Sequence, residues 1–129
     1  MTTDHAAGEF AYTVQTTDQH TAAAFGNTGV HVVGTAALIG FLETAAAGCA
    51  QPLLGPGDGT VGTMIAVRHL AAAPANASVD ARARLLSREG RRLTFSVEVH
   101  WGDVVLMSGT HERAIVNLAR FLARLPTAQ

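Results

Sequence analysis

The stretch Thr35–Gln51, TAALIGFLETAAAGCAQ, decides the fold of this 129-residue chain. Alanine and leucine dominate it and favour a helix, and Pro52 follows as a helix stop. A helix of this length extends about 25 Å, at ~1.5 Å per residue. Its surface is apolar nearly all round apart from Glu43, Thr44 and the glycines, so we expect it to be largely buried.

The segments on both sides of this helix alternate with the period of two that is typical of strands. Before the helix, Phe10, Tyr12 and Val14 alternate with smaller or more polar neighbours. After it, a cluster of glycine and proline at 55–59 breaks the chain. Four further strands are then expected in hairpin sequence: Thr60–Ala73, Val79–Leu85, Leu93–Val99 and Val104–Ile115.

Turn and cap residues punctuate the second half of the chain. Glu89-Gly90 and Trp101-Gly102-Asp103 have the composition of hairpin turns, and Asn117 can cap a short helix that carries Leu118, Phe121, Leu122 and Leu125. A sheet that curls around one apolar helix buries that helix. The sequence therefore predicts an α+β fold.

Length and composition restrict the class of protein. We interpret residues 1–129 as one domain with residues 1–8 flexible, because domains usually run to about 100–150 residues. The net charge of −1 argues against a nucleic-acid or membrane-surface partner. All nine basic residues are arginine and the first is Arg68, so we expect no secretory signal. With Cys49 as the single cysteine, we expect a cytoplasmic protein without disulfides.

Four stretches carry a resemblance to a known family: Gly34-Thr35 with Gly40–Glu43, Gly62-Thr63 leading to Val67–His69, Glu89–Leu93, and Gly109–Ala114. Through them the chain resembles the fluoroacetyl-CoA thioesterase family of hotdog enzymes, over roughly Gly34 to Leu125. The resemblance implies a hotdog fold, a curved antiparallel sheet wrapped around a long central helix. It also implies hydrolysis of a short acyl-CoA thioester to free acid and CoA, without a metal or another cofactor.

The resemblance also implies which residues form the site. The threonine, glutamate and histidine that do the chemistry in the family fall on Thr35, Glu43 and His69. Substrate-binding positions fall on Gly62 and Arg113. The segment Thr17–Val33 departs from the family pattern, since it offers a single aromatic residue, Phe25, where the family enzyme has an aromatic-rich lid. We expect Phe25 to contact substrate, and we do not expect selectivity for fluoroacetyl.

The chemistry of these residue types fits hydrolysis of a thioester, which needs a nucleophile or base, a proton donor and dipoles aimed at the oxyanion. Threonine alone is a weak nucleophile and needs a base within hydrogen-bond reach, which His69 can be. Attack by Glu43, or by water that Glu43 activates, is the alternative. On one straight helix Thr35 and Glu43 lie about 12 Å apart along the axis. The site therefore has Thr35 at or before the helix start, or it draws residues from two chains of a homodimer.

Each candidate residue also has a structural interpretation. Glu43 can face solvent from the wet edge of the helix, and His69 can be a packing residue. Gly62 can mark a bulge in a strand. Arg113 can bind a CoA phosphate or pair with an acid such as Glu112 or Glu98. The functional alternatives are a catalytically silent hotdog module that binds acyl-CoA, and a thioesterase for carrier-protein-bound or longer acyl groups.

Overall fold

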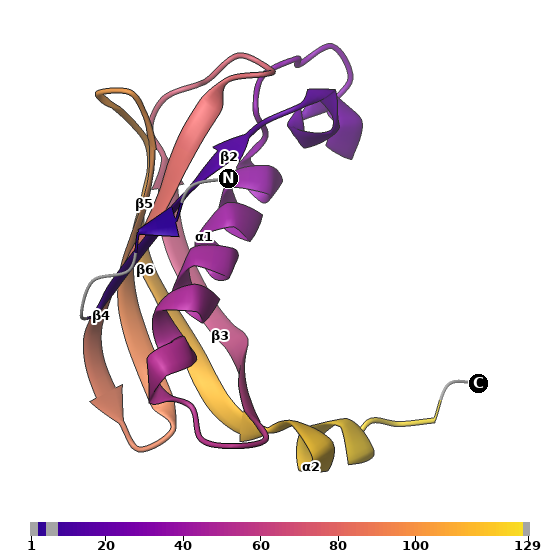
Figure 1. Ribbon diagram of the computed structural model, residues 1–129. Coiled ribbons are helices and arrows are strands. Elements are labelled where there is room, and N and C mark those ends of the chain that lie inside the picture. The colour runs from indigo at the N-terminus through magenta and orange to yellow at the C-terminus, as the bar shows by residue number, and fades with distance from the viewer. Residues whose placement is uncertain (1–2, 5–7, 128–129) are drawn as a thin grey trace.

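The computed structural model describes residues 3–4 and 8–127, which form a six-stranded antiparallel sheet and one long helix (Figure 1). The flexibility that the sequence predicts for residues 1–8 stays a prediction, since residues 1–2 and 5–7 lie outside the described part. The strands are β1 (Thr3–Asp4), β2 (Glu9–Gln15), β3 (Asp58–His69), β4 (Ser78–Glu89), β5 (Arg92–Trp101) and β6 (Val104–Asn117). The helices are α1 (Thr35–Ala50) and α2 (Leu118–Ala123), with short 3-10 turns η1 (Asp18–His20), η2 (Ala23–Phe25) and η3 (Gln51–Leu53).

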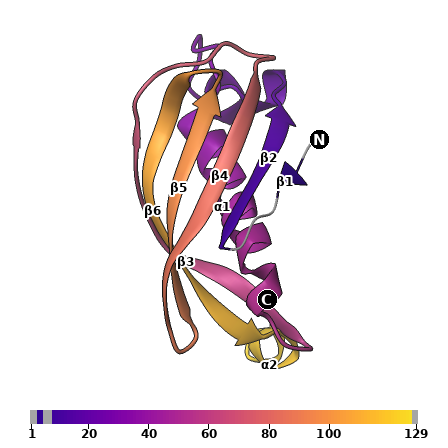
Figure 2. The same ribbon diagram turned by 60° about the vertical axis from the view of Figure 1, so that its left-hand side comes forward.

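The central helix α1 lies along the inner face of the curved sheet, as Figures 1 and 2 show from two sides. The predicted α+β arrangement is therefore confirmed. Leu38 and Leu42 of α1 are fully buried, and Phe95 and Val97 of β5 belong to the same core. The phenol of Tyr12 on β2 donates a hydrogen bond to the carbonyl of Phe41 at 3.1 Å, which ties the helix to the sheet.

One strip of α1 is exposed, which corrects the expectation of a largely buried helix. Seven of its 16 residues are buried, whereas Thr35, Ala36, Gly40, Glu43 and Thr44 are exposed. The reason is geometric, because the sheet covers only one side of the helix. By length and composition alone the segment Thr35–Leu53 resembles a membrane span, but its buried residues form the core of this domain.

The strand order β1-β2-β4-β5-β6-β3 corrects a second expectation. The strands β4, β5 and β6 do follow one another through hairpin turns at Gly90 and Gly102, whose φ values of 63° and 57° suit glycine. The strand β3, however, pairs with β6 and not with β4. The chain between β3 and β4 crosses to the far side of β5 and β6. Alternation predicted each strand but did not specify its neighbour.

The segment from 17 to 33 is folded over the start of α1. It forms η1 and η2, and isolated bridges join Thr21 to Val33 and Val32 to Pro74. A side chain at Gly34 would lie 3.0 Å from the backbone nitrogen of Ala22, so glycine permits this close approach. The end of the chain also follows the prediction, because the side chain of Asn117 caps α2 by accepting a hydrogen bond from the backbone N–H of Arg120 at 3.0 Å.

Candidate active site

The structure brings the predicted threonine and histidine together. Thr35 is the first residue of α1, and His69 is the last residue of β3. Their side chains meet at 2.8 Å, between the hydroxyl oxygen of Thr35 and Nδ1 of His69. This contact joins a hydroxyl to a possible base at the N-terminal end of a helix, where backbone N–H groups are unpaired.

The second ring nitrogen of His69 has no hydrogen-bond partner in the part of the chain that the structure describes. Nε2 is buried and makes no hydrogen bond within residues 3–4 and 8–127. If the hydroxyl of Thr35 donates to Nδ1, the ring proton is on Nε2, since a neutral imidazole carries a single N–H. A buried N–H of this kind requires an acceptor. Substrate, water or a second chain can supply one.

The carboxylate of Glu43 lies farther along the same helix. The axial separation of about 12 Å from Thr35 follows from helix geometry, because both residues lie on α1. Glu43 is half-exposed, at 49%, and one of its oxygens lies 3.6 Å from Nη1 of Arg113. Glu43 is thus exposed to solvent, as its structural interpretation expected, but its carboxylate is also held in an ion pair with Arg113.

The guanidinium of Arg113 is buried, with 7% of the residue exposed. Nε donates to the hydroxyl of Thr60 at 2.9 Å, and Nη2 donates to the carbonyl of Thr60 at 3.0 Å. The acid that pairs with it is Glu43, and not Glu112 or Glu98 as the sequence suggested. Alternation explains this, since neighbouring residues of β6 face opposite sides of the sheet. Burial lowers the pKa of Arg113, and the charge of Glu43 opposes that shift.

Sequence reasoning missed His111, which completes this cluster. His111 is 1% exposed, and its Nδ1 lies 2.7 Å from the carbonyl of Met64. Its Nε2 lies 3.2 Å from Nη1 of Arg113. Burial is the main cause that lowers the pKa of His111, and the charge of Arg113 adds to it. The available signal was the spacing of two residues between His111 and Arg113, which puts both on the inner face of β6.

Gly62 allows the carboxylate of Glu43 to approach β3. A Cβ at Gly62 would lie 2.8 Å from that carboxylate and 3.2 Å from the ring of His111. The register of β3 shifts between Gly62 and Met64, so the bulge expected at Gly62 is present. A pocket of about 260 Å³ opens here and is lined by Glu43, Gly62, Thr63, Met64, Ile65 and His111.

Phe25 is not brought to this pocket. It lies on η2 with 59% of its surface exposed. Its predicted contact with substrate stays a prediction.

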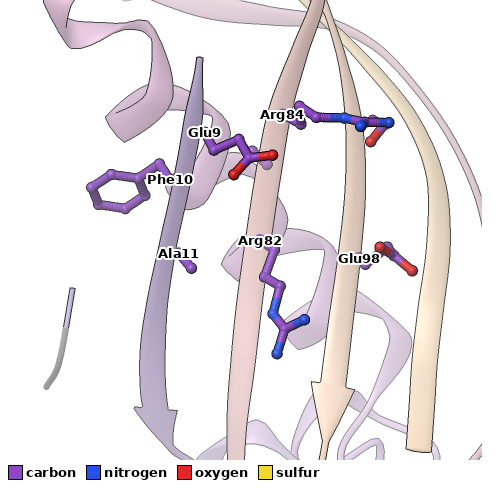
Figure 3. Close-up of a pocket in the computed structure, with 8 residues that line it drawn as sticks. Glu9, Phe10, Ala11, Arg82, Arg84 and Glu98 are labelled. Carbon is purple, nitrogen blue, oxygen red and sulfur yellow. The ribbon is translucent and has the colours of Figure 1, made fainter. Parts of the chain in front are cut away.

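A second and larger pocket, of about 350 Å³, lies on the opposite face of the sheet (Figure 3). Glu9 and Glu98 line it together with Arg82 and Arg84, so it carries both signs of charge. Figure 3 shows Phe10 turned away from this face, which is consistent with its position against α1. The predicted catalytic residues are absent from its lining. In the described part of the chain, no group of three His, Cys, Asp or Glu side chains could hold a metal.

A curved antiparallel sheet wrapped around one long central helix defines a hotdog fold. A hot-dog-like protein from Thermanaerovibrio acidaminovorans shares this fold, with a TM-score of 0.80 over 96% of each chain at 19% identity. A sequence profile of the family described as "Fluoroacetyl-CoA-specific thioesterase" matches residues 16–119. The chain belongs to this family, and it is a thioester hydrolase.

Two relatives show how close the similarity is. The fluoroacetyl-CoA thioesterase of Streptantibioticus cattleyicolor is 43% identical over 94 residues, which are 73% of this chain and 68% of that protein. The crystal structure of a mutant of the fluoroacetyl-CoA-specific thioesterase FlK, in complex with fluoroacetate and CoA, is 35% identical. It superposes with a TM-score of 0.84, covering 89% of this chain and 94% of that one. The resemblance seen in the sequence is thus confirmed, and acyl-CoA thioesterase activity is supported.

Proposed function

We propose that this protein hydrolyses a short-chain acyl-CoA, with Thr35, His69 and Glu43 as its catalytic residues. The contact of 2.8 Å between Thr35 and His69 carries the proposal, because it supplies an activated hydroxyl. The relative crystallised with fluoroacetate and CoA supports a small acyl group on CoA as the class of substrate. The pocket beside Glu43, at about 260 Å³, also suits a small group.

In this mechanism Nδ1 of His69 takes the proton of the Thr35 hydroxyl while its oxygen attacks the thioester carbonyl. The C–S bond then breaks, the acyl group stays on the threonine oxygen, and CoA leaves as a thiolate that takes up the proton from His69. His69 then takes a proton from water, which attacks the threonine ester. The C–O bond to Thr35 breaks, the acid leaves, and His69 returns the proton to the threonine oxygen. Backbone N–H groups at the start of α1 are suited to stabilise the oxyanion.

The role of Glu43 depends on where the second chain lies. Within one chain Glu43 is about two helical turns from Thr35. The buried Nε2 of His69 needs an acceptor that the described residues do not provide. We propose that the partner's Glu43 takes this place in a homodimer, so that each site contains residues of both chains. In both cases the carboxylate lies over Gly62 of its own chain. In the alternative, Glu43 serves its own chain, as the base for water.

The edge of the sheet supports a homodimer. The strand β3 has 12 residues and is hydrogen-bonded to β6 alone among the described strands. A long edge strand presents unpaired N–H and C=O groups that a second copy can pair with. Met64 on this strand is exposed and apolar, and symmetric dimers are the commonest closed assembly.

A panel of acyl-CoA substrates tests the function. Purified protein is mixed with acetyl-, fluoroacetyl-, branched, aromatic and long-chain acyl-CoA, and with an acylated carrier protein, and thiol release is measured. We expect turnover to be fastest on short acyl-CoA, and to fall by at least about 100-fold in Thr35→Ala. Thr35→Ser should keep most of the rate. Preference for a long chain or for the carrier protein would contradict the proposal.

The shared site is tested by mixing two inactive variants. Thr35→Ala and Glu43→Gln protomers are unfolded, mixed in equal amounts and refolded. If each site uses both chains, half of the dimers are mixed and each has one intact site, so activity recovers to about a quarter of the wild-type value. No recovery, with a dimer seen in sedimentation, would restrict the site to one chain. The cytoplasmic location stays a prediction.

A further inference from the structure

The buried polar cluster behind Glu43 is not used in the mechanism above. His111 and Arg113 are 1% and 7% exposed, in the interior of a domain whose other buried residues are nearly all apolar. Burying an arginine and a histidine is costly unless every polar atom is paired. The stability of this cluster therefore depends on the hydrogen bonds that His111 and Arg113 make.

The contacts fix the protonation state of His111. A carbonyl only accepts, so Nδ1 of His111 must carry the proton that it donates to Met64. An arginine only donates, so Nε2 must be the unprotonated nitrogen that accepts from Arg113 at 3.2 Å. The ring is therefore neutral, and a second proton would turn this hydrogen bond into a contact between two cations.

The same nitrogen of Arg113 continues to Glu43. Nη1 lies between His111 Nε2, at 3.2 Å, and the carboxylate of Glu43, at 3.6 Å. The two other guanidinium nitrogens are held by Thr60. The guanidinium is thus oriented by two contacts with Thr60 and one with His111. Its Nη1 also faces the carboxylate of Glu43, which lines the pocket.

We propose that His111 is a positioning residue, a neutral hydrogen-bond acceptor that orients Arg113 and through it fixes the carboxylate of Glu43 over Gly62. The proposal rests on the catalytic role of Glu43 proposed above. A displacement of about 1 Å at a catalytic group can cost on the order of 100-fold in rate. The hydrogen bond by which His111 orients Arg113 is therefore expected to affect kcat.

Two substitutions separate the two hydrogen bonds of His111. In His111→Gln the amide oxygen reaches the place of Nε2 and can still accept from Arg113, but the donor to Met64 is lost. In His111→Asn the amide nitrogen takes the place of Nδ1 and can still donate to Met64, but the acceptor for Arg113 is lost. A merely structural histidine, which ties β6 to β3, would be replaced better by asparagine.

The expected result is a kcat for His111→Asn that is at least about 10-fold below that of His111→Gln, with similar KM values. Adding His111→Asn to Glu43→Gln should lower kcat by no more than about threefold further, because both changes act on one group. His100→Asn, on the outer side of β5, is the matched control and should keep the wild-type kcat. Equal kcat for the two His111 variants, or a faster asparagine variant, would overturn the proposal.

A measurement on the unsubstituted protein covers the case in which the variants fail to fold. In protein with ¹⁵N-labelled histidine, NMR at pH 7 should show the His111 ring with Nδ1 protonated and Nε2 unprotonated. A ring protonated on Nε2 would overturn the proposal without touching the function. If Glu43→Gln keeps its kcat, the catalytic role of Glu43 and this inference fall together. If Glu43→Gln is inactive but the His111 variants are equal, only the inference falls.

Discussion

The two places where α1 meets β3 are built in opposite ways. At the start of the helix, Thr35 and His69 share one hydrogen bond, and Nε2 of His69 has no partner among the described residues. Two turns later, Glu43 is paired with a buried guanidinium that has three further hydrogen-bond contacts. The first place keeps hydrogen-bonding capacity for groups from outside the chain. At the second, the guanidinium that holds the carboxylate is itself fixed by residues of the same chain.

This difference indicates a division of labour. A nucleophile and base must exchange protons with substrate, so their hydrogen bonds have to change during the reaction. A carboxylate that acts by its charge or as an acceptor is most effective when it is fixed beforehand. The following substitutions test that division, from the largest expected effect to the smallest.

Removing His69, the base at the start of α1, should have the largest effect on kcat. His69→Ala removes the group that takes the proton of Thr35, and we expect kcat to fall by about 1,000-fold. CoA binding should change little, because the imidazole faces the hydroxyl and not the nucleotide in this mechanism. Stopped-flow or endpoint thiol assays give the rate, and titration calorimetry with CoA gives the affinity. Loss of CoA binding at a normal rate would place His69 in the binding surface.

Neutralising the carboxylate of Glu43 should lower kcat by a smaller factor. Glu43→Gln keeps the size of the side chain but removes its charge, and we expect kcat to fall by at least about 100-fold. Thermal unfolding should occur at a lower temperature, because Glu43 is the counter-charge of the buried Arg113 guanidinium. An active Glu43→Gln enzyme would leave Glu43 as a solvent-facing residue that balances the charge of Arg113.

Displacing the carboxylate of Glu43 without removing it should lower kcat by a still smaller factor. In Gly62→Ala the new methyl group would lie 2.8 Å from the carboxylate of Glu43, so the carboxylate must move. We expect a loss of about 10-fold in kcat. The control is Gly55→Ala, whose methyl group would meet its nearest atom, in Asp58, at an ordinary 3.4 Å. Equal rates for the two variants would show that the approach over Gly62 is not needed.

The smallest effect concerns stability and pH. Burial lowers the pKa of His111 in the folded protein, so the unfolded chain binds a proton first as the pH falls below about 6.5. The free energy of unfolding should therefore decrease as the pH falls from 6.5 towards the lowered pKa of the folded state. Urea unfolding between pH 7.5 and 5.5 measures this slope, and His111→Gln should make it shallower. An unchanged slope would contradict a buried neutral ring.

Local patterns in the sequence predicted much of the fold. The apolar run and Pro52 located α1 to within one residue, and alternation located the strands around Phe10 and Phe95. The glycines at 90 and 102 located both hairpin turns. These features depend on neighbours along the chain, which the sequence displays directly.

Features that depend on distant pairing were predicted less well. Alternation does not specify a partner strand, so the pairing of β3 with β6 was missed. For Arg113 the sequence offered a CoA phosphate or an acid such as Glu112 or Glu98, whereas the acid that it pairs with is Glu43, on α1. His111 lies in the stretch Gly109–Ala114 that carries the resemblance, but only its place on the inner face of β6 beside Arg113 shows what it contacts.

The pairing of β3 with a strand distant in the sequence has a consequence for how the protein becomes active as it folds. The pairs between β3 and β6 run from His69 with Met107 to Asp58 with Asn117, which are 107 − 69 = 38 and 117 − 58 = 59 positions apart. The hairpins of β4, β5 and β6 close much shorter loops, and contacts between distant positions form more slowly. His69 and Gly62 both lie on β3, so a chain that has formed its hairpins still lacks a site. Enzymatic activity thus reports on a strand pairing that the local hairpins alone do not provide.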